Sequence, residues 1–351
     1  MLQLGLNGEG QHTMNLLRLK LLNKFLVATL LLTVFGLPAA TIASSGETPV
    51  TQQDAGSASE PEGIPITSEL VWESCGSCHQ LDDQDRMSRI SYMRATPEGW
   101  QHKMQRMMTL NGLQLEPDMA RGVVKYLSDN LGIAPEEYRA SAWESERRMV
   151  DYDSPIESLN LTCKQCHSLG RVINQRRTKE EWGLLLAMHR GYYPLVDVVG
   201  FRLRESDPES VDKRYRMDRA IDNLAAVFPL ETPEWTEWST NMRDPQLEGT
   251  WALSGHHAGQ GPVYGSAVIT ANPDNPSQFV TETTYTYPQS GKSVSRSGRA
   301  NVYTGFQWRG QSTEENPTQE DWGTDSLKEV MFFPANLFQE FDVNISIFSG
   351  F

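Results

Sequence analysis

Two copies of the pentapeptide Cys-x-x-Cys-His constrain this chain more than any other feature of its sequence. They occupy residues 75–79 and 163–167, and together they contain all four cysteines of the 351-residue chain. The motif is typical of c-type haem attachment, in which two thiols bind the haem covalently and the adjacent histidine binds its iron. A redox dithiol or half of a zinc site is the alternative interpretation, but a dithiol does not need the histidine that follows each pair here. The sequence therefore predicts two covalently bound haem c groups, held by Cys75, Cys78 and His79 and by Cys163, Cys166 and His167.

A basic segment followed by an apolar run opens the chain. The basic segment begins at Met14, the apolar run spans the 13 residues 25–37, and small residues at 41–43 offer a cleavage site. This pattern predicts a secretory signal peptide with an upstream extension over residues 1–43, because a membrane span needs ~20 apolar residues. An uncleaved N-terminal anchor is the alternative. Bacterial haem c attachment takes place outside the cytoplasmic membrane, so we expect a periplasmic mature chain that begins near Ser44 and has no membrane span.

The chain is strongly acidic. Its formal net charge is −14, and removing residues 1–43, which hold three basic residues and one acidic residue, makes it −16. Such a charge repels nucleic acid and anionic membranes, and it could steer a basic redox protein toward the chain. Solubility alone is the alternative explanation of the charge.

Composition divides the mature chain into a lead-in and two larger parts. Residues 44–65 are rich in Ser, Gly, Pro and acids, which predicts a flexible lead-in. Residues 66–240 show helical periodicity. Residues 241–351 alternate polar and apolar positions in short runs, with strands expected at 250–254, 263–270, 279–287 and 300–308. The predicted fold class is multidomain α plus β: a tandem cytochrome-c-like α-helical dihaem domain, with modules at about 66–140 and 150–240, followed by an antiparallel β-barrel domain at 241–351.

An internal repeat follows each haem motif. Residues 96–100 (TPEGW) and 178–182 (TKEEW) both have the pattern of a helix start. We expect the threonine to cap each helix, Pro97 to occupy a first helical position, and Glu181 to complete a capping box. A third helix is expected in each module, at 116–130 in the first and at 208–228 in the second.

The repeat also indicates the second axial ligand of each iron. Met107 and His189 lie seven residues after the tryptophans of the two repeats, on the same helix face, and both residue types commonly bind haem iron. Met188 is the alternative to His189. The other candidates for the first iron are Met93, Met104, Met108, Met119 and His102, of which Met104 and Met108 are the strongest.

The two ligand sets predict different haems. His79 with Met107 gives a His/Met haem, and His167 with His189 gives a bis-His haem; methionine raises the reduction potential relative to histidine. We therefore expect electrons to pass from the second haem to the first. Two six-coordinate irons leave no open position, which favours electron transfer over peroxide chemistry. The pair at 256–257 (HH) should not bind one metal ion, because adjacent strand residues face opposite sides; an edge or turn position is expected.

Beyond these motifs, the chain resembles the α subunit of quinohaemoprotein amine dehydrogenase over roughly residues 66–330. The resemblance runs from CGSCH through five longer stretches: RISYMRATPEGW, VVKYLSDNLGIAPEE, LTCKQCHSLGRV, RTKEEWGLLLAMHRGYYPL and LEGTWALSGHHAGQGPVYG. Paired haem motifs occur in many cytochromes, so the combination with this β domain makes the resemblance specific.

The resemblance implies a periplasmic heterotrimer. A small subunit carries a cysteine tryptophylquinone that oxidises primary amines to aldehyde and ammonia, and another subunit is a β-propeller. The dihaem subunit takes electrons from the quinone and passes them to a soluble acceptor such as a blue-copper protein or a cytochrome c. The family's bis-His and His/Met haems match His167 with His189 and His79 with Met107. No catalytic residue is expected on this chain, because the quinone belongs to a partner.

The chain departs from the family pattern near its end. The family's α subunit continues into two further β-sandwich domains, whereas this chain ends at Phe351, and its last stretch from Pro334 differs from the family's continuation. We interpret this as a frameshift or a truncation, either of which predicts an incomplete barrel with an exposed edge and an apolar tail. Two alternative functions stay open from sequence: a free-standing dihaem electron carrier and a dihaem peroxidase-type enzyme.

Overall fold

The computed structural model describes residues 63–138, 157–202, 204, 211–244, 246–257, 259–315, 326–332 and 347–348. The expected signal segment, nearly all of the expected lead-in and most of the stretch after Pro334 lie outside these residues. Within the described ranges, no helix has both the length and the apolar character needed to cross a membrane.

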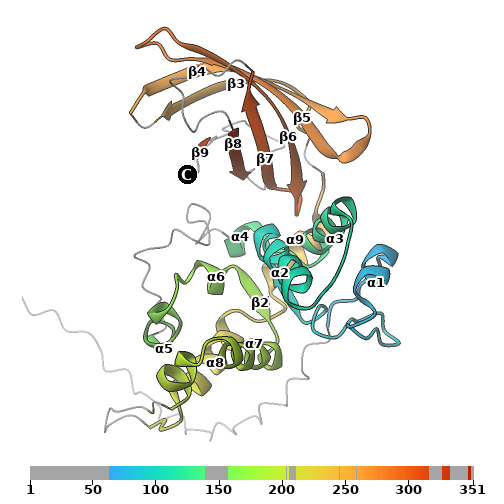
Figure 1. Cartoon of the computed structure of the whole chain (residues 1–351), viewed down its shortest axis with the longest axis vertical. Coiled ribbons are helices and arrows are strands. Elements are labelled where there is room, and N and C mark those ends of the chain that lie inside the picture. The colour runs from blue at the N-terminus through green and yellow to red at the C-terminus, as the bar shows by residue number, and fades with distance from the viewer. Residues whose placement is uncertain are drawn as a thin grey trace, which may run out of the picture. The chain divides into compact units, whose positions relative to one another are not determined.

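Helices and one short strand build the first haem-motif region (Figure 1). Thr96 caps the long second helix through a hydrogen bond from the Gly99 N–H, and Pro97 begins it, as the sequence predicts. The third helix also begins as expected, and the apolar faces of both helices share one core with Trp100. The elements are α1 (Glu69–Cys75), β1 (Met93–Ala95), α2 (Pro97–Leu110), α3 (Pro117–Asn130) and α4 (Pro135–Tyr138).

The second haem-motif region repeats this order with differences. Its core forms around Trp182 and Leu224. Its elements are α5 (Glu157–Leu161), the 3₁₀ turn η2 (Cys163–Gln165), α6 (Gly170–Ile173), β2 (Gln175–Arg177), α7 (Lys179–Tyr192), the π-helical turn η3 (Asp197–Phe201) and α8 (Arg216–Val227). A further helix, α9 (Pro233–Asn241), follows.

Two local predictions in this region were wrong. Thr178 accepts a hydrogen bond from the Glu181 N–H, but the Glu181 carboxylate binds Arg89 instead of completing the capping box. The third helix begins at Arg216, so residues 211–215 are not helical as expected, and the expected start at 208 lies outside the described residues. Asp212 accepts a hydrogen bond from the Arg214 N–H, which forms a turn that holds the chain out of the helix.

One carbonyl in each region ties the repeat together. The Leu131 carbonyl, at the end of α3, accepts hydrogen bonds from the Trp100 indole at 2.9 Å and from the Ala95 N–H at 3.0 Å. The Phe228 carbonyl, at the end of α8, accepts the matching bonds from the Trp182 indole and the Arg177 N–H, both at 3.3 Å. The repeat found in the sequence is therefore also a repeat of tertiary contacts.

The two regions meet through a two-stranded antiparallel sheet, β1 with β2. Its central pair is Arg94 opposite Arg176, flanked by Met93 opposite Arg177 and Ala95 opposite Gln175. Arg94 stands two residues before the Thr96 cap, and Arg176 stands two residues before the equivalent cap. The repeats therefore pair through equivalent residues, as the two halves of a two-fold symmetric interface do.

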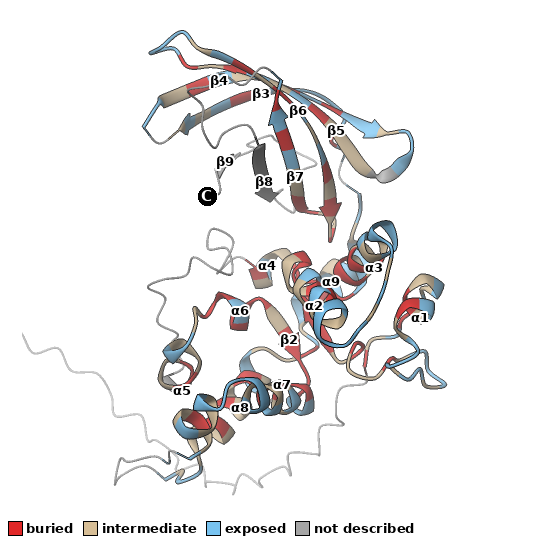
Figure 2. Ribbon diagram, in the orientation of Figure 1, coloured by how far each residue is buried: buried red, intermediate tan, exposed pale blue. Residues whose placement is uncertain are grey.

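The C-terminal part is one antiparallel sheet in which each strand pairs with the next (Figure 1). Buried and exposed residues alternate along β4 and β6, as expected for strands with one covered face (Figure 2). The antiparallel pairing of the strands was predicted correctly, but among the described strands no pairing joins β3 to β9, so no closed barrel is found. The strands are β3 (Gly249–His257), β4 (Gly261–Asn272), β5 (Asn275–Thr286), β6 (Ser293–Tyr303), β7 (Gln307–Glu314), β8 (Ser326–Phe332) and β9 (Ile347–Phe348).

The strand expected at 300–308 is instead the tip of a hairpin. Thr304 and Gly305 have φ values of 55° and 72°, which turn the chain between β6 and β7. The Thr304 N–H donates to the Asp129 carboxylate at 2.7 Å, and its hydroxyl donates to the Ser128 carbonyl at 2.9 Å. The Trp238 indole donates to the Thr304 carbonyl. This turn is therefore built by its contacts with α3 and α9 rather than by its own residues.

Candidate functional site

The first haem motif lies at the end of α1. Cys75 is the last residue of that helix, and its carbonyl accepts hydrogen bonds from the Cys78 and His79 N–H groups at 3.1 and 2.9 Å. This turn places the three motif side chains within one helical turn of one another. In the second motif the equivalent bond, from the Cys166 N–H to the Cys163 carbonyl, measures 3.3 Å.

All four cysteines are free thiols. Burial raises the pKa of Cys75 to about 11, with a further contribution from the neighbouring Cys78. Burial likewise raises the pKa of Cys163. The first thiol of each motif is therefore protonated at neutral pH, in contrast to the low-pKa thiolate of a redox dithiol.

Three histidines share one hydrogen-bonding arrangement. The Nδ1 atoms of His79, His167 and His189 lie 2.9, 2.7 and 2.8 Å from the backbone carbonyls of Ser88, Ser168 and Leu185. A carbonyl can only accept, so each Nδ1 carries the proton and each Nε2 keeps its lone pair. Histidines that ligate metals are typically fixed in this way. The donor set therefore fits haem iron.

The structure brings His167 and His189 into the same neighbourhood. Burial lowers the pKa of His189, against the raising effect of its hydrogen bond to Leu185, and electrostatic interaction with His167, Arg106 and Arg177 lowers it slightly more. The sulfur of Met188, the alternative ligand, lies 3.4 Å from an Arg106 Nη1. This contact holds the methionine toward α2 and leaves His189 as the better candidate.

The methionines near the first motif lie in different surroundings. Met104 is buried in the core beside Trp100, Met107 is half-buried, and Met108 is 38 % exposed. No described contact joins Met107 to His79 or to either thiol of the first motif. The assignment of Met107 thus rests on its position in the repeat, and it stays a prediction, as does that of His189.

Comparison with known families decides what kind of protein these motifs belong to. Residues 66–235 match the model of the haem-binding domain of the quinohemoprotein amine dehydrogenase α subunit, and residues 244–336 match the model of domain II of the same subunit. The chain belongs to this family. A search of curated proteins gave no significant match. The family is a subunit of a multisubunit amine dehydrogenase, an oxidoreductase, and the chain contains the haem-binding domain of that family.

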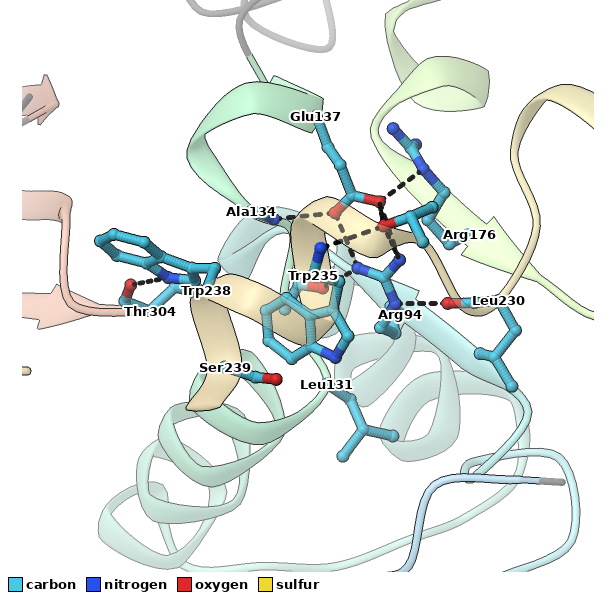
Figure 3. Close-up of polar contacts among 12 residues, drawn as sticks. Arg94, Leu131, Ala134, Glu137, Arg176, Leu230, Trp235, Trp238, Ser239 and Thr304 are labelled. Carbon is cyan, nitrogen blue, oxygen red and sulfur yellow. Dashed lines mark hydrogen bonds and ion pairs between the residues drawn. The ribbon is translucent and has the colours of Figure 1, made fainter. Parts of the chain in front are cut away.

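A buried ion-pair network lies where the two haem-binding regions meet (Figure 3). Glu137 binds Arg94 through two hydrogen bonds of 2.8 Å and Arg176 through one of 3.0 Å. Arg94 is fully buried, donates to the Leu230 carbonyl and stacks against Trp235. Sequence reasoning missed this network, because the three charged residues lie on separate elements. The only available signal was that the two arginines hold equivalent places in the repeat.

The histidine pair at 256–257 lies on β3, an edge strand, as expected. His256 is exposed, whereas the Nδ1 of His257 lies 2.8 Å from the Tyr287 hydroxyl. The two rings therefore have different surroundings.

Proposed function

We propose that this chain is the electron-transfer dihaem c subunit of a periplasmic quinohaemoprotein amine dehydrogenase. In this proposal it relays electrons from a cysteine tryptophylquinone in a small partner subunit to a soluble redox protein, such as a blue-copper protein or a cytochrome c. A β-propeller subunit completes the complex. The observation that carries the proposal is that one chain contains both family domains together with two Cys-x-x-Cys-His motifs.

The chain's own residues hold the haems in two cytochrome-c-like modules. The four thiols that would attach them are those of Cys75, Cys78, Cys163 and Cys166. His79 and His167 would bind the irons through Nε2, and Met107 and His189 would be the second ligands. Bound haem supplies one-electron redox chemistry at its iron. If side chains supply two ligands to each iron, no open position is left, which would favour electron transfer over peroxide turnover.

The test is amine-dependent haem reduction in the assembled complex. The full chain is expressed with its secretion signal, together with the products of neighbouring genes, and is purified through a tag on this chain. We expect a primary amine to produce the reduced haem absorption bands in the complex under anaerobic conditions, but not in this chain purified alone.

Two outcomes would contradict the proposal. Haems that no primary amine reduces in the intact complex would exclude the amine dehydrogenase role and favour a free-standing electron carrier. Rapid haem bleaching or turnover with hydrogen peroxide would favour a peroxidase-type enzyme, because that reaction needs an open or displaceable iron ligand.

A further inference from the structure

Two arginines pair with one carboxylate at the start of α7, and a third arginine reaches the same helix from α2. Arg89 binds Glu181 at 2.7 Å, and Arg177 lies 3.5 Å from the same carboxylate. The Arg106 guanidinium, on α2, donates to the neutral sulfur of Met188 on α7. Within the described part of the chain, Glu181 is the one acid that pairs with these arginines. The cluster carries excess positive charge in a chain whose formal net charge is −14.

The guanidinium of Arg177 has an unsatisfied donor. Its side chain is only 3 % exposed, and its Nε donates to Gln175 at 3.0 Å. Its Nη1 has no hydrogen-bond partner, since the Glu181 oxygen at 3.5 Å is too distant for a good bond. A buried charged group that lacks a bond costs free energy, and an unmade bond of this kind points to a missing acceptor.

The charges in the cluster repel one another. Burial, opposed by Glu181 and assisted by the neighbouring charges of Arg89 and Arg106, lowers the pKa of Arg177 to about 10. The group is still charged at neutral pH. An anion placed between Arg106 and Arg177 would relieve this repulsion and supply the missing acceptor.

The cluster lies beside the proposed place of the second haem. Arg106 contacts Met188, the residue before the proposed ligand His189, and the Arg177 guanidinium covers the ring of Trp182 on the same helix at 5.7 Å. Haem carries two propionate carboxylates on one edge. A planar guanidinium matches a carboxylate with two parallel hydrogen bonds, which makes arginine the preferred partner for such a group.

We propose that Arg106 and Arg177 bind a propionate of the second haem. The inference rests on the proposed function, because that function attaches a haem at residues 163–167. Arg177 belongs to the second haem-motif region and Arg106 to the first. The same carboxylate would therefore tie the two regions together and place positive charge near the iron. Positive charge favours the ferrous state, because reduction adds an electron.

The test is a spectroelectrochemical titration of the full haem-loaded chain with chemical mediators, which needs neither an amine nor a partner subunit. We expect Arg106→Leu and Arg177→Leu each to lower the lower-potential step. The ratio of oxidised to reduced haem at a fixed potential should rise at least tenfold, which corresponds to ~59 mV for one electron. Arg106→Lys keeps the charge and should shift this step less. Arg121→Leu, at a side chain that is 63 % exposed, is the matched control and should leave both steps in place.

The outcomes separate this inference from the proposed function. If the leucine variants have the same potentials as the Arg121→Leu control, the propionate site is overturned. It is also overturned if only the upper step shifts, because that result would assign the carboxylate to the first haem. Arg106 is half-buried, so its variant tests the site even if Arg177→Leu does not fold. If the leucine variants do shift the lower-potential step but no amine reduces the haems of the complex, the proposed function is overturned and the propionate site is kept.

Discussion

At the scale of single residues, Glu137 is the buried carboxylate that pairs with two arginines. It binds arginines that hold equivalent places in the two repeats, and its side chain is 3 % exposed. The pKa of its carboxyl falls to about 2; hydrogen bonds and charge from Arg94 and the charge of Arg176 outweigh the opposing effect of burial. Removing this carboxylate would leave two buried arginines without a counter-charge. The loss in the free energy of unfolding should therefore exceed the net stability that the ion pairs contribute.

Glu137→Gln should therefore destabilise the chain by about 3–5 kcal/mol at neutral pH, the usual cost of breaking a buried ion pair. Because the folded pKa is depressed, the stabilisation is present above the unfolded pKa near 4.5 and is lost as the pH falls toward 2. The difference between wild type and variant should shrink over this window. Urea unfolding at a series of pH values measures it, with the exposed neighbour Glu136→Gln as the control. A constant difference between pH 7 and pH 2 would contradict the assignment.

The ligand of the first iron is also a question about one residue. If Met107 binds that iron, Met107→His should lower the upper redox step, because histidine ligation lowers the potential relative to methionine. The lower step should stay in place. Redox titration of the loaded chain measures both steps, and the exposed Met108→His is the control. An upper step that follows a Met104 substitution and not one of Met107 would move the assignment to Met104.

At the scale of elements, contacts with α3 and α9 stabilise the turn of the β6–β7 hairpin. Thr304 is fully buried and has the left-handed backbone conformation that favours glycine. Its contacts with Ser128, Asp129 and Trp238 hold it there. The same hairpin contributes Phe306 to a core shared with Ile133 and Trp308. The turn therefore joins the sheet to the end of α3.

Two glycines with nearly equal φ values test how tightly this hairpin packs. Gly305 (φ 72°) has the Arg243 carbonyl 2.9 Å from where a Cβ would stand, whereas Gly291 (φ 71°) has open space there. Gly291→Ala should cost only the backbone strain, roughly 1–2 kcal/mol. Gly305→Ala should cost an additional 1–3 kcal/mol or so from overpacking. Urea unfolding of both variants checks this, and equal losses would mean that the hairpin tip yields freely.

At the scale of the whole molecule, net charge acts on a partner at long range, before the two proteins are in contact. The formal net charge of −14 becomes −16 without residues 1–43. Opposite charge steers association, and salt screens it over about 10 Å at 0.1 M. If the proposed acceptor is a basic soluble redox protein, its rate of reduction by the complex should fall roughly tenfold or more as salt rises from low to high concentration.

Stopped-flow measurement of that reduction provides the check. An acidic acceptor of similar size is the control, and its rate should rise or stay level as salt increases. A basic acceptor whose rate is independent of salt would show that the acidic surface serves solubility and not docking.

Several features of this chain were determined by short-range sequence patterns. The haem motifs, the Thr96 and Thr178 caps, α3 and the alternation of the β strands all depend on residues within a few positions of one another, so local rules predicted them. The family was also recognised from short continuous stretches of sequence, which do not depend on tertiary contacts. Local rules failed where a distant partner intervened: Glu181 turned to Arg89, and the 300–308 run folded back at Thr304.

Only the tertiary structure decided how the pieces meet. The sequence showed two repeats, but the pairing of Arg94 with Arg176 and the carboxylate of Glu137 between them depend on three separate elements. The sequence likewise gave no sign that the Arg177 guanidinium would be buried with an open donor. Charged residues cluster in space because burial demands partners, and the elements that supply those partners are chosen by packing rather than by sequence separation.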